Sequence, residues 1–509
     1  MPSPTSLSAA LMASMLLTTP AMSTTYEEQY IGTIGSFARF AGSQLMHDGS
    51  VIVVTGEGGP NLQNEYNIQR FHNGKKDMLF ESDSAIHRFK AYENGHATWT
   101  SYESFPSGEV IEKLNYYDGE AIHELDRIPQ HLSNSFITYV VTQNGHTLWE
   151  SETVTDIRQG TRSCALKYFD GSTIKVLNDD TDCSTTGVHY NDQGQAIWYD
   201  YPPETARNTE VSREVYLFDG ASTKQLTTTN TPIFTRSTPS SRAKINNHGQ
   251  AAWRSIDEQG KYGLSLYAEN NITELTHSAD SLYHVMNNNN QIAWVENENA
   301  LYFYESETVL HIPTQGEIHN LRLNDSGWLS WRNENYDIYR YKEGEIKSHM
   351  SNTGLFARYT PFILKNGDFF VPFYSEPYSP PSPYRPLPPP PHMYYYDGTT
   401  FKDITGIVEG ESRTSGELFQ TKSGKAAWPI RENIDTDLCM GYAGSKRSKL
   451  HIFDGETITF YKTRIDDPCT GGIRVIDMNE QGDILITLDQ ELGTMQSSTY
   501  ELILLKATP

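Results

Sequence analysis

The chain has 509 residues, of which 37% are hydrophobic and 12% aromatic, so it can bury one large core or several ordinary ones. Its 64 acidic and 40 basic residues give a formal net charge of −24. That charge repels nucleic-acid phosphates and anionic lipids, which excludes their nonspecific binding as the main role.

Residues 1–23 are predicted to be a secretory signal peptide. An apolar run extends from Leu7 to Leu17, and the small-x-small site Ala21-Met22-Ser23 follows it. No other stretch approaches the roughly 18 apolar residues of a membrane span. We therefore expect a secreted or periplasmic protein without a membrane span, in which residues 24–509 form one domain.

After a short predicted strand from Glu28 to Thr33, one pattern occurs ten times. Each copy has an apolar run, a turn that ends in glycine, and a second apolar run. In the copy that begins at Met286, Asn290 stands where the other copies have glycine, and both residue types readily take positive φ. The copies are LMHDGSVIV (Leu45), YENGHATW (Tyr92), TQNGHTLW (Thr142), YNDQGQAIW (Tyr190), INNHGQAAW (Ile245), MNNNNQIAW (Met286), LNDSGWLSW (Leu323), LKNGDFFVP (Leu364), TKSGKAAW (Thr421) and MNEQGDILI (Met478).

A second signature, aromatic residues running into Asp-Gly, follows several copies, as in KYFDG (Lys167) and YLFDG (Tyr216). This is a strong hairpin signal. Each repeat is thus predicted to hold four short strands, A to D. Strand B carries a tryptophan in seven copies, and these tryptophans are predicted to be buried core between blades. Repeats 37 to 58 residues apart are typical of propeller blades, whose sheets bury their faces against one another.

The last repeat offers only three strands, so the strand at Glu28 to Thr33 is predicted to complete it and close the ring. The predicted fold is therefore all-β, a β-propeller of about ten four-stranded repeats closed by the N-terminal strand. Two smaller propellers, or repeats merged into fewer blades, remain open because ten blades exceed the usual four to eight.

The repeat resembles the TolB-like family of propeller repeats, in which a W-S-P-D-G turn joins strands A and B. Here the corresponding turns contain NHG, DQG or DSG, without proline. The resemblance extends over about Ser36 to Lys506, and it implies the architecture alone.

Four cysteines occur, at Cys164, Cys183, Cys439 and Cys469. In an exported protein an even number favours disulfides, and the pairs 164–183 and 439–469 are the simplest of three connectivities. Four unpaired buried thiols are the alternative.

Carboxylates gather beside the second pair of cysteines. Calcium prefers several oxygen ligands on a loop, so a structural calcium site is one interpretation, and solvated acidic loops are the other. The candidate ligands are Asp435, Asp437, Asp466 and Asp467. No further cofactor is expected.

The predicted A–B and C–D turns are short and uniform, whereas the B–C and D–A loops on the opposite face vary widely in length. We therefore expect the variable face to carry function. The longest loop, Pro372 to Met393, is rich in proline, which favours a stiff wall over that face. An inert surface loop is the alternative.

The first half of strand A, toward the variable face, is predicted to carry many Arg, His and Tyr residues. A cationic mouth on an acidic protein suits an anionic, hydroxyl-rich ligand. The alternative is that these side chains neutralise one another and nearby carboxylates. The candidate substrate-binding residues are His87, Arg88, His319, Arg322, Arg358, Tyr359 and Arg474.

In size, export and all-β architecture the chain resembles secreted propeller polysaccharide lyases of the ulvan lyase type. The resemblance implies β-elimination at a uronic acid, with a His base, a Tyr acid and an Arg that neutralises the carboxylate. No residue spacing matches a catalytic set of these enzymes. By composition and position, His189, Tyr283 and Arg242 are the candidates for base, acid and neutraliser.

A non-catalytic binding propeller that recognises glycan or protein is the rival interpretation, and a hydrolase is the third. The sequence has no nucleophile elbow, metalloprotease motif, phosphate loop or dinucleotide fingerprint. We expect a monomer that acts on an acidic polysaccharide.

Overall fold

The computed structural model describes most of the repeat region. The described residues are 25–34, 42–57, 65–83, 86–92, 94–129, 135–142, 144–156, 161–180, 186–200, 214–227, 243–256, 261–349, 356–357, 361, 363–374, 392–404, 411–412, 418–432, 448–462, 473–491 and 498–508. All regular structure in these ranges is β-strand. No helix in this part of the chain is therefore long and apolar enough to cross a membrane.

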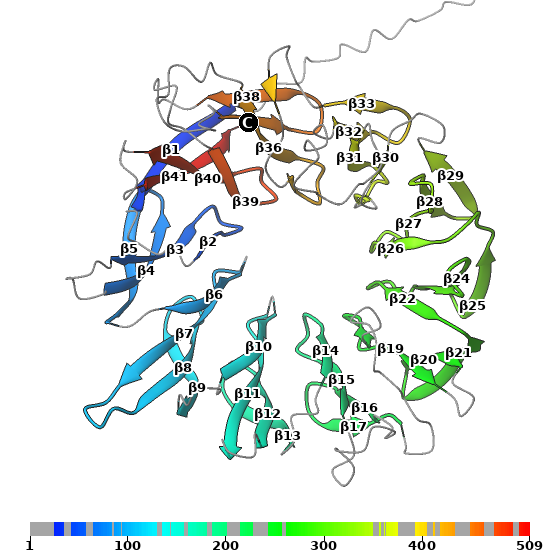
Figure 1. Cartoon of the computed structure of the whole chain (residues 1–509), viewed down its shortest axis with the longest axis horizontal. Helices are drawn as coiled ribbons and strands as arrows, with labels where there is room; N and C mark the ends of the chain where they lie inside the picture. The colour runs from blue at the N-terminus through cyan, green and yellow to red at the C-terminus, as the bar shows by residue number, and fades with distance from the viewer. Residues whose placement is uncertain are drawn as a thin grey trace, which may run out of the picture.

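Ten antiparallel sheets stand around an axis as the blades of one propeller, which confirms the predicted fold class and repeat number (Figure 1). Blades 1 to 5 comprise β2 (Gly42–Leu45), β3 (Val51–Glu57), β4 (Glu65–His72) and β5 (Lys75–Ser82); β6 (His87–Ala91), β7 (Ala97–Ser104), β8 (Val110–Tyr117) and β9 (Ile122–Pro129); β10 (Ser135–Val141), β11 (Thr147–Asp156), β12 (Thr161–Phe169) and β13 (Ile174–Asp180); β14 (Thr186–Tyr190), β15 (Ala196–Asp200), β16 (Glu214–Phe218) and β17 (Thr223–Gln225); β18 (Lys244–Ile245), β19 (Ala251–Ile256), β20 (Tyr262–Ala268) and β21 (Asn271–Ala279).

Blades 6 to 10 follow the same order, except that β34 and β35 both pair with β36 as a divided inner strand of blade 9. These blades comprise β22 (Leu282–Met286), β23 (Ile292–Glu296), β24 (Ala300–Glu305) and β25 (Thr308–Ile312); β26 (His319–Leu323), β27 (Leu329–Arg332), β28 (Ile338–Lys342) and β29 (Glu345–His349); β30 (Phe356–Ala357), β31 (Phe369–Tyr374), β32 (His392–Tyr396) and β33 (Phe401–Asp403); β34 (Glu411–Ser412), β35 (Phe419–Gln420), β36 (Ala426–Glu432), β37 (Ser448–Phe453) and β38 (Ile458–Lys462); β39 (Ile473–Met478), β40 (Ile484–Glu491), β41 (Ser498–Thr508) and β1 (Thr25–Ile34).

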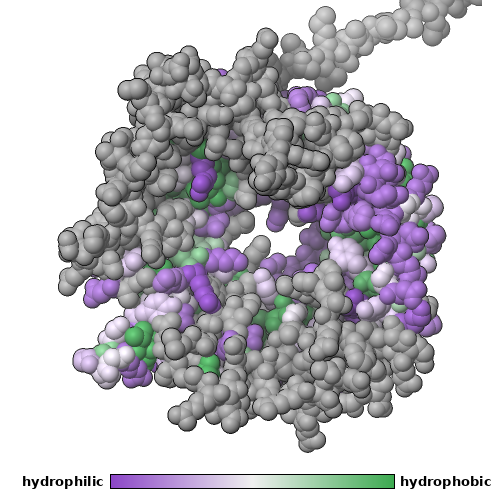
Figure 2. All heavy atoms as spheres, in the orientation of Figure 1, coloured by the Kyte–Doolittle hydropathy of each residue, from purple (hydrophilic) through white to green (hydrophobic). Residues whose placement is uncertain are grey.

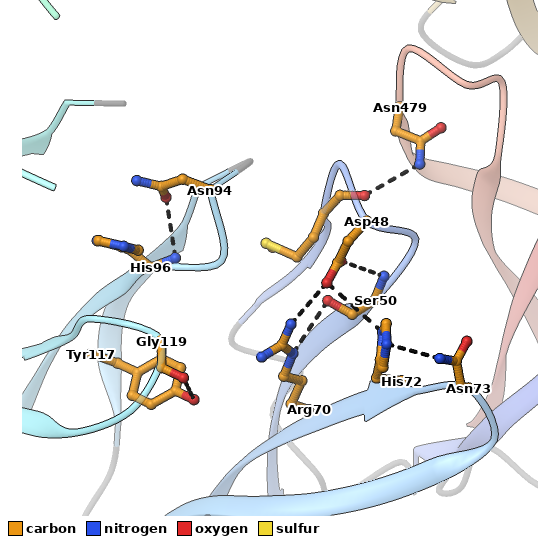
Figure 3. A network of polar contacts seen from close by, with 11 residues as sticks. Asp48, Ser50, Arg70, His72, Asn73, Asn94, His96, Tyr117, Gly119 and Asn479 are labelled. Atoms are coloured by element: carbon orange, nitrogen blue, oxygen red, sulfur yellow. Dashed lines mark hydrogen bonds and ion pairs between the residues drawn. The ribbon is translucent and has the colours of Figure 1, made fainter. Parts of the chain in front are cut away.

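The N-terminal strand closes the ring, as predicted. β1 pairs antiparallel with β41, from Thr25 opposite Thr508 to Ile34 opposite Tyr500, and so becomes the outer strand of blade 10. Blade 10 then contacts blade 1, where the side-chain amide of Asn479 donates to the Met46 carbonyl at 3.2 Å. Figure 3 shows this contact beside the Asp48–Arg70 ion pair of blade 1, whose Nη2–Oδ2 distance is 2.9 Å.

The hydrophobic core lies between the blades. Trp253 of blade 5 packs with Ile197 and Leu217 of blade 4, and Trp331 of blade 7 packs with Val295 and Phe303 of blade 6. The seven strand-B tryptophans are all 1% exposed or less, which confirms their predicted structural role. They are Trp99, Trp149, Trp198, Trp253, Trp294, Trp331 and Trp428. Large buried aromatic surfaces therefore join each sheet to the next.

Strand A carries a bulge opposite the strand-B tryptophan in blades 2, 4 and 7. Two residues of strand A oppose one of strand B there, because the register shifts between His87 and Lys90, for example. The first bulged residue has a left-handed backbone: Arg88 (φ 51°), Gly187 (φ 66°) and Asn320 (φ 54°). A bulge re-aims the side chains that follow it, so simple alternation does not say which of these residues face the axis.

The A–B turns form a hydrogen-bonded belt between neighbouring blades. In blade 4 the Asn191 side chain accepts from the backbone N–H groups of its own turn and donates to the Asn246 carbonyl of blade 5 at 2.7 Å. Asn287 and Asn324 make the corresponding bonds to blades 7 and 8. Turn capping and blade-to-blade cohesion thus use the same side chain.

Each of the four consecutive asparagines, residues 287–290, has a distinct contact in this belt. Asn287 caps the turn, Asn288 bonds Asp325 of blade 7, and Asn289 donates to the Asp325 carbonyl. Asn290 has φ 62°, as its alignment with glycine predicts, and its side-chain oxygen accepts from Asn246 of blade 5 at 3.0 Å. The tract is therefore one copy of the repeat.

Candidate functional site: a cationic cavity in the central channel

The inner strands of blades 4 to 8 contribute to a cavity of about 230 Å³. Figure 2 shows an opening through the middle of the ring, with hydrophilic side chains around it. His189 of β14, Lys244 of β18 and Arg322 of β26 supply the basic groups of the cavity, and Trp328 supplies an aromatic one. Among the described lining residues there is no aspartate or glutamate.

Arg322 keeps its positive charge although it is partly buried. Burial lowers the pKa of Arg322, and the nearby Tyr283 opposes that shift. An arginine starts from so high a pKa that it stays protonated at neutral pH. A negative ligand group that enters the cavity therefore meets a positive charge on a half-buried side chain, where screening is weaker than in bulk water.

A backbone contact selects the tautomer of His189 in its neutral form. Its Nδ1 accepts a hydrogen bond from the Ile245 N–H at 3.2 Å. In a neutral imidazole one nitrogen donates and the other accepts, so the proton resides on Nε2. In this tautomer Nε2 is a hydrogen-bond donor.

Tyr283 lies beside the cavity, and its hydroxyl joins two blades. It donates to the Leu321 carbonyl of blade 7 at 2.8 Å. Burial raises the pKa of the phenol, and Arg322 acts in the opposite direction. Arg242, the third catalytic candidate, lies outside the described residues, two positions before the cavity-lining Lys244.

The other described candidates are spread around the ring. Arg88 lies in blade 2, where burial raises the pKa of Glu112 and Arg88 lowers it. In blade 7 the Nε2 of His319 lies 3.6 Å from a carboxylate oxygen of Glu317. These two contacts fit the alternative in which the basic groups neutralise nearby carboxylates.

His87 of blade 2 packs edge-on against Tyr102, with 5.3 Å between the ring centroids, and Arg474 is exposed on β39 of blade 10. Of the predicted site residues, the structure brings only His189 and Arg322 together in one described cavity. Arg358 and Tyr359 lie outside the described residues.

One expectation about placement is wrong. His189 and Arg322 were expected near the variable face, but each is the penultimate residue of its strand A and lies just before the A–B turn. The reason is the short inner strand of five residues, in which the bulge occupies the first half. The cavity is thus close to the face that carries the uniform turns.

Sequence reasoning missed Lys244 and Trp328. The predicted cationic mouth comprised only Arg, His and Tyr residues of strand A, so it did not include Lys244. Trp328 had a usable signal, since it is the one tryptophan that directly follows a turn glycine and is not on strand B. The Arg340 guanidinium lies 4.9 Å and the Lys342 Nζ 5.2 Å from its ring centroid, so this aromatic ring already has two cationic neighbours.

Most of the predicted cysteine and calcium positions lie outside the described residues. Cys164 is buried on β12 and is not a free thiol, but Cys183, Cys439 and Cys469 are not described, so both pairings stay predictions. The same holds for Asp435, Asp437, Asp466 and Asp467. The described part of the chain has no group of three or more His, Cys, Asp or Glu residues suited to a metal ion.

No protein-family model and no curated protein matches the chain. Among solved structures it is similar to an acylaminoacyl peptidase from Pyrococcus horikoshii, with 8% identity over 69% of this chain and a TM-score of 0.31. A second similar structure is the propeller domain of the trilobed protease from Pyrococcus furiosus. The identity is 10%, the alignment covers 83% of this chain and 97% of that domain, and the TM-score is 0.29. The chain spans 58% of the length of the first peptidase.

A puromycin-hydrolysing peptidase from Mycobacterium tuberculosis is a third similar structure. The identity is 12%, the alignment covers 69% of this chain and 60% of that chain, and the TM-score is 0.28. Similarities this weak carry no argument about activity. They link the chain neither to TolB-like proteins nor to a polysaccharide lyase, so both resemblances stay predictions.

Proposed function

We propose that this protein is an exported binding propeller that holds an acidic polysaccharide by a charged group seated in the cationic cavity. One observation carries the proposal: Lys244 and Arg322, which are cationic, and His189, whose Nε2–H is a donor, line one cavity on a chain of net charge −24. Concentrating positive charge against such a background favours an anionic ligand group.

The size and lining of the cavity narrow the ligand. Its volume of about 230 Å³ is below the roughly 300–1,000 Å³ of sites that enclose drug-sized ligands. One carboxylate or sulfate with part of its sugar ring fits that space, and the rest of the chain stays outside. Ile245, Leu321 and Trp328 supply apolar surface for the ring.

The contacts of the candidate base and acid favour binding over elimination. A lyase base must accept a proton, but Nδ1 of His189 already accepts from Ile245 and Nε2 carries the proton. The Tyr283 hydroxyl donates to the Leu321 carbonyl. Both groups would have to give up an existing contact to take part in proton transfer.

A polysaccharide lyase with His189, Tyr283 and Arg242 in the catalytic roles is the second candidate. Its support is the proximity of Arg322 to Tyr283, where the guanidinium favours the ionised phenol against the effect of burial. An acid next to a carboxylate-binding arginine is an arrangement that uronate elimination needs.

Binding is tested by calorimetric titration with alginate, polygalacturonate and neutral dextran. We expect binding of at least one polyuronate, none of dextran, and a loss of about tenfold or more in affinity for Arg322→Met and for Lys244→Met. Arg127→Met, on the outer strand of blade 2, is the matched control. Equal binding of dextran, or full affinity in Arg322→Met, would refute the proposal.

Elimination is tested in the same samples by the ultraviolet absorbance of unsaturated uronates. We expect no increase over buffer. An increase that His189→Ala removes would replace the binding proposal with the lyase.

A further inference from the structure

A second cavity, of about 240 Å³, adjoins the first and shares His189, Ile245 and Met286 with it. Its remaining walls come from the A–B turns of blades 4 to 7. The two cavities therefore follow one another along the inner wall, and the second is the one beside the turns.

The second cavity differs from the first in its chemistry. The carboxylates of Asp192 and Asp325 line it, together with the side-chain amides of Asn247 and Asn288. The belt holds these groups in place, since Asn247 donates to Asp192 at 2.8 Å and Asn288 donates to Asp325 at 3.1 Å. A carboxylate has about four acceptor positions, so each of the two aspartates keeps acceptor capacity beyond its bonds in the belt.

An aromatic ring stands where the two cavities meet. Tyr190 lines the second cavity, is 36% exposed, and stacks on His189 with 6.2 Å between the ring centroids. A half-exposed aromatic face next to fixed acceptors and amides is what the C–H face and hydroxyl groups of a sugar require.

We infer that the second cavity binds the hydroxyl groups of the same sugar unit whose acidic group occupies the first. The ligand is then a sugar acid with one charge and neutral hydroxyl neighbours, and it enters from the face of the A–B turns. Asp192 and Asp325 would repel a second anionic group, so a densely sulfated chain is disfavoured. This inference rests on the proposed function.

The test compares acetate, glucuronate and glucose as probes of the full chain, by NMR or calorimetric titration at fixed ionic strength. Acetate carries only the charge, glucose only the hydroxyls, and glucuronate both. We expect glucuronate to bind about tenfold or more tighter than acetate, and glucose to bind more weakly than either.

Two variants separate the cavities. Tyr190→Ala and Asp325→Asn should each weaken glucuronate about tenfold, while acetate binds unchanged in the first and unchanged or tighter in the second, because a negative charge is lost. Asp325→Asn keeps the shape of the side chain, and Tyr190→Ala removes a half-exposed ring, so thermal unfolding should show that both fold.

The outcomes distinguish this inference from the proposed function. If acetate and glucuronate bind equally, depend on Arg322 and ignore Tyr190→Ala and Asp325→Asn, the second cavity is not a sugar subsite and the anion site stands. If neither anion binds, or Arg322→Met changes nothing, both proposals fall.

Discussion

The A–B turns and the C–D turns lie on the same face of the ring and use similar residues, yet their side chains make different contacts. The Asn287 side chain of an A–B turn accepts from two N–H groups of its own turn and donates to the Asn324 carbonyl of the next blade. Asp219 of a C–D turn accepts from the N–H groups of Ala221 and Ser222, two and three residues later in its own turn.

The distance from the axis accounts for this difference. Blades converge at their inner strands and diverge at their outer ones, as Figure 1 shows. Neighbouring A–B turns are therefore within hydrogen-bonding distance, whereas the aspartates of C–D turns near the rim, such as Asp219 and Asp170, accept from N–H groups of their own turns. The same turn chemistry holds blades together near the axis and shapes a single hairpin near the rim.

Removing a belt asparagine should have the largest effect. Asn287→Ala leaves buried N–H groups of the turn and a carbonyl of the next blade without a partner, so we expect a loss of about 2–3 kcal/mol in the free energy of unfolding. Urea denaturation of the full chain measures it. Asp219→Ala, at a more exposed turn, should lose about 1 kcal/mol.

Asn287→Asp refines that test, because it keeps the acceptor for the turn but replaces the donor to Asn324 and Gln291 with a negative charge that faces their oxygens. At neutral pH we therefore expect a loss at least as large as in Asn287→Ala; a smaller loss would show that Asn287 acts mainly as the acceptor of its own turn. Equal losses in Asn287→Ala and Asp219→Ala would mean that contact between blades adds nothing to turn capping.

Two glycines give a matched pair of smaller effect. Gly194 of an A–B turn and Gly171 of a C–D turn both have positive φ, at 77° and 94°. A Cβ at Gly194 would lie 2.2 Å from Nδ1 of His146 in the preceding blade, whereas a Cβ at Gly171 meets nothing within 4 Å. The two positions therefore differ in crowding and share the backbone strain.

We expect Gly171→Ala to cost about 1 kcal/mol from the left-handed backbone alone, and Gly194→Ala to cost about 1 kcal/mol more because His146 and the Tyr168 hydroxyl, 2.6 Å from the added Cβ, must both move. Thermal and urea unfolding of both variants measure the difference. If His146 and Tyr168 both move away without cost, the two losses will be equal, and the belt is looser than its contacts indicate.

The sequence was sufficient for the ring and insufficient for the site. Turn glycines, Asp-Gly hairpins and strand-B tryptophans repeat with the blades, so they predicted ten units, buried tryptophans and closure by β1. The site depends on single departures from the repeat, such as Trp328, and on the strand-A bulges, which shift His189 and Arg322 relative to simple alternation. The bulges have no sequence signature except, in blades 4 and 7, a residue type that readily takes positive φ: Gly187 and Asn320.

At the rim, the stability that the C–D turn of blade 4 contributes should depend on pH, because its Asp219 titrates at low pH. Burial opposes ionisation of its carboxylate, but the N–H groups of Ser222 and Ala221, with Lys224, outweigh burial and lower the pKa from 3.8 to about 2. A lowered folded-state pKa contributes stability that is present above about pH 4 and is lost as pH falls toward 2.

Asp219→Asn should remove that contribution but keep the hydrogen bonds of the turn, so we put its loss at about 0.5 kcal/mol after allowing for screening at a partly exposed site. Urea unfolding at pH 6 and at pH 3 measures it: the difference between wild type and Asp219→Asn should shrink at pH 3. A difference that stays constant would show that the turn depends on hydrogen bonds and not on charge.

The smallest effect is expected at Asn290, where the turn and the belt oppose each other. Asn290→Gly relieves a left-handed backbone with φ 62° but removes the oxygen that accepts from Asn246 of blade 5. The two changes are each worth about 0.5–1 kcal/mol and have opposite signs, so the free energy of unfolding, measured in urea, should change by less than about 0.5 kcal/mol.

Asn290→Ala, which keeps the strain and loses the bond, should be destabilised by about 1 kcal/mol relative to Asn290→Gly. If Asn290→Gly is instead more stable than wild type by that amount, the side chain of Asn290 contributes nothing to cohesion, and the copy at Met286 tolerates asparagine where its neighbours use glycine.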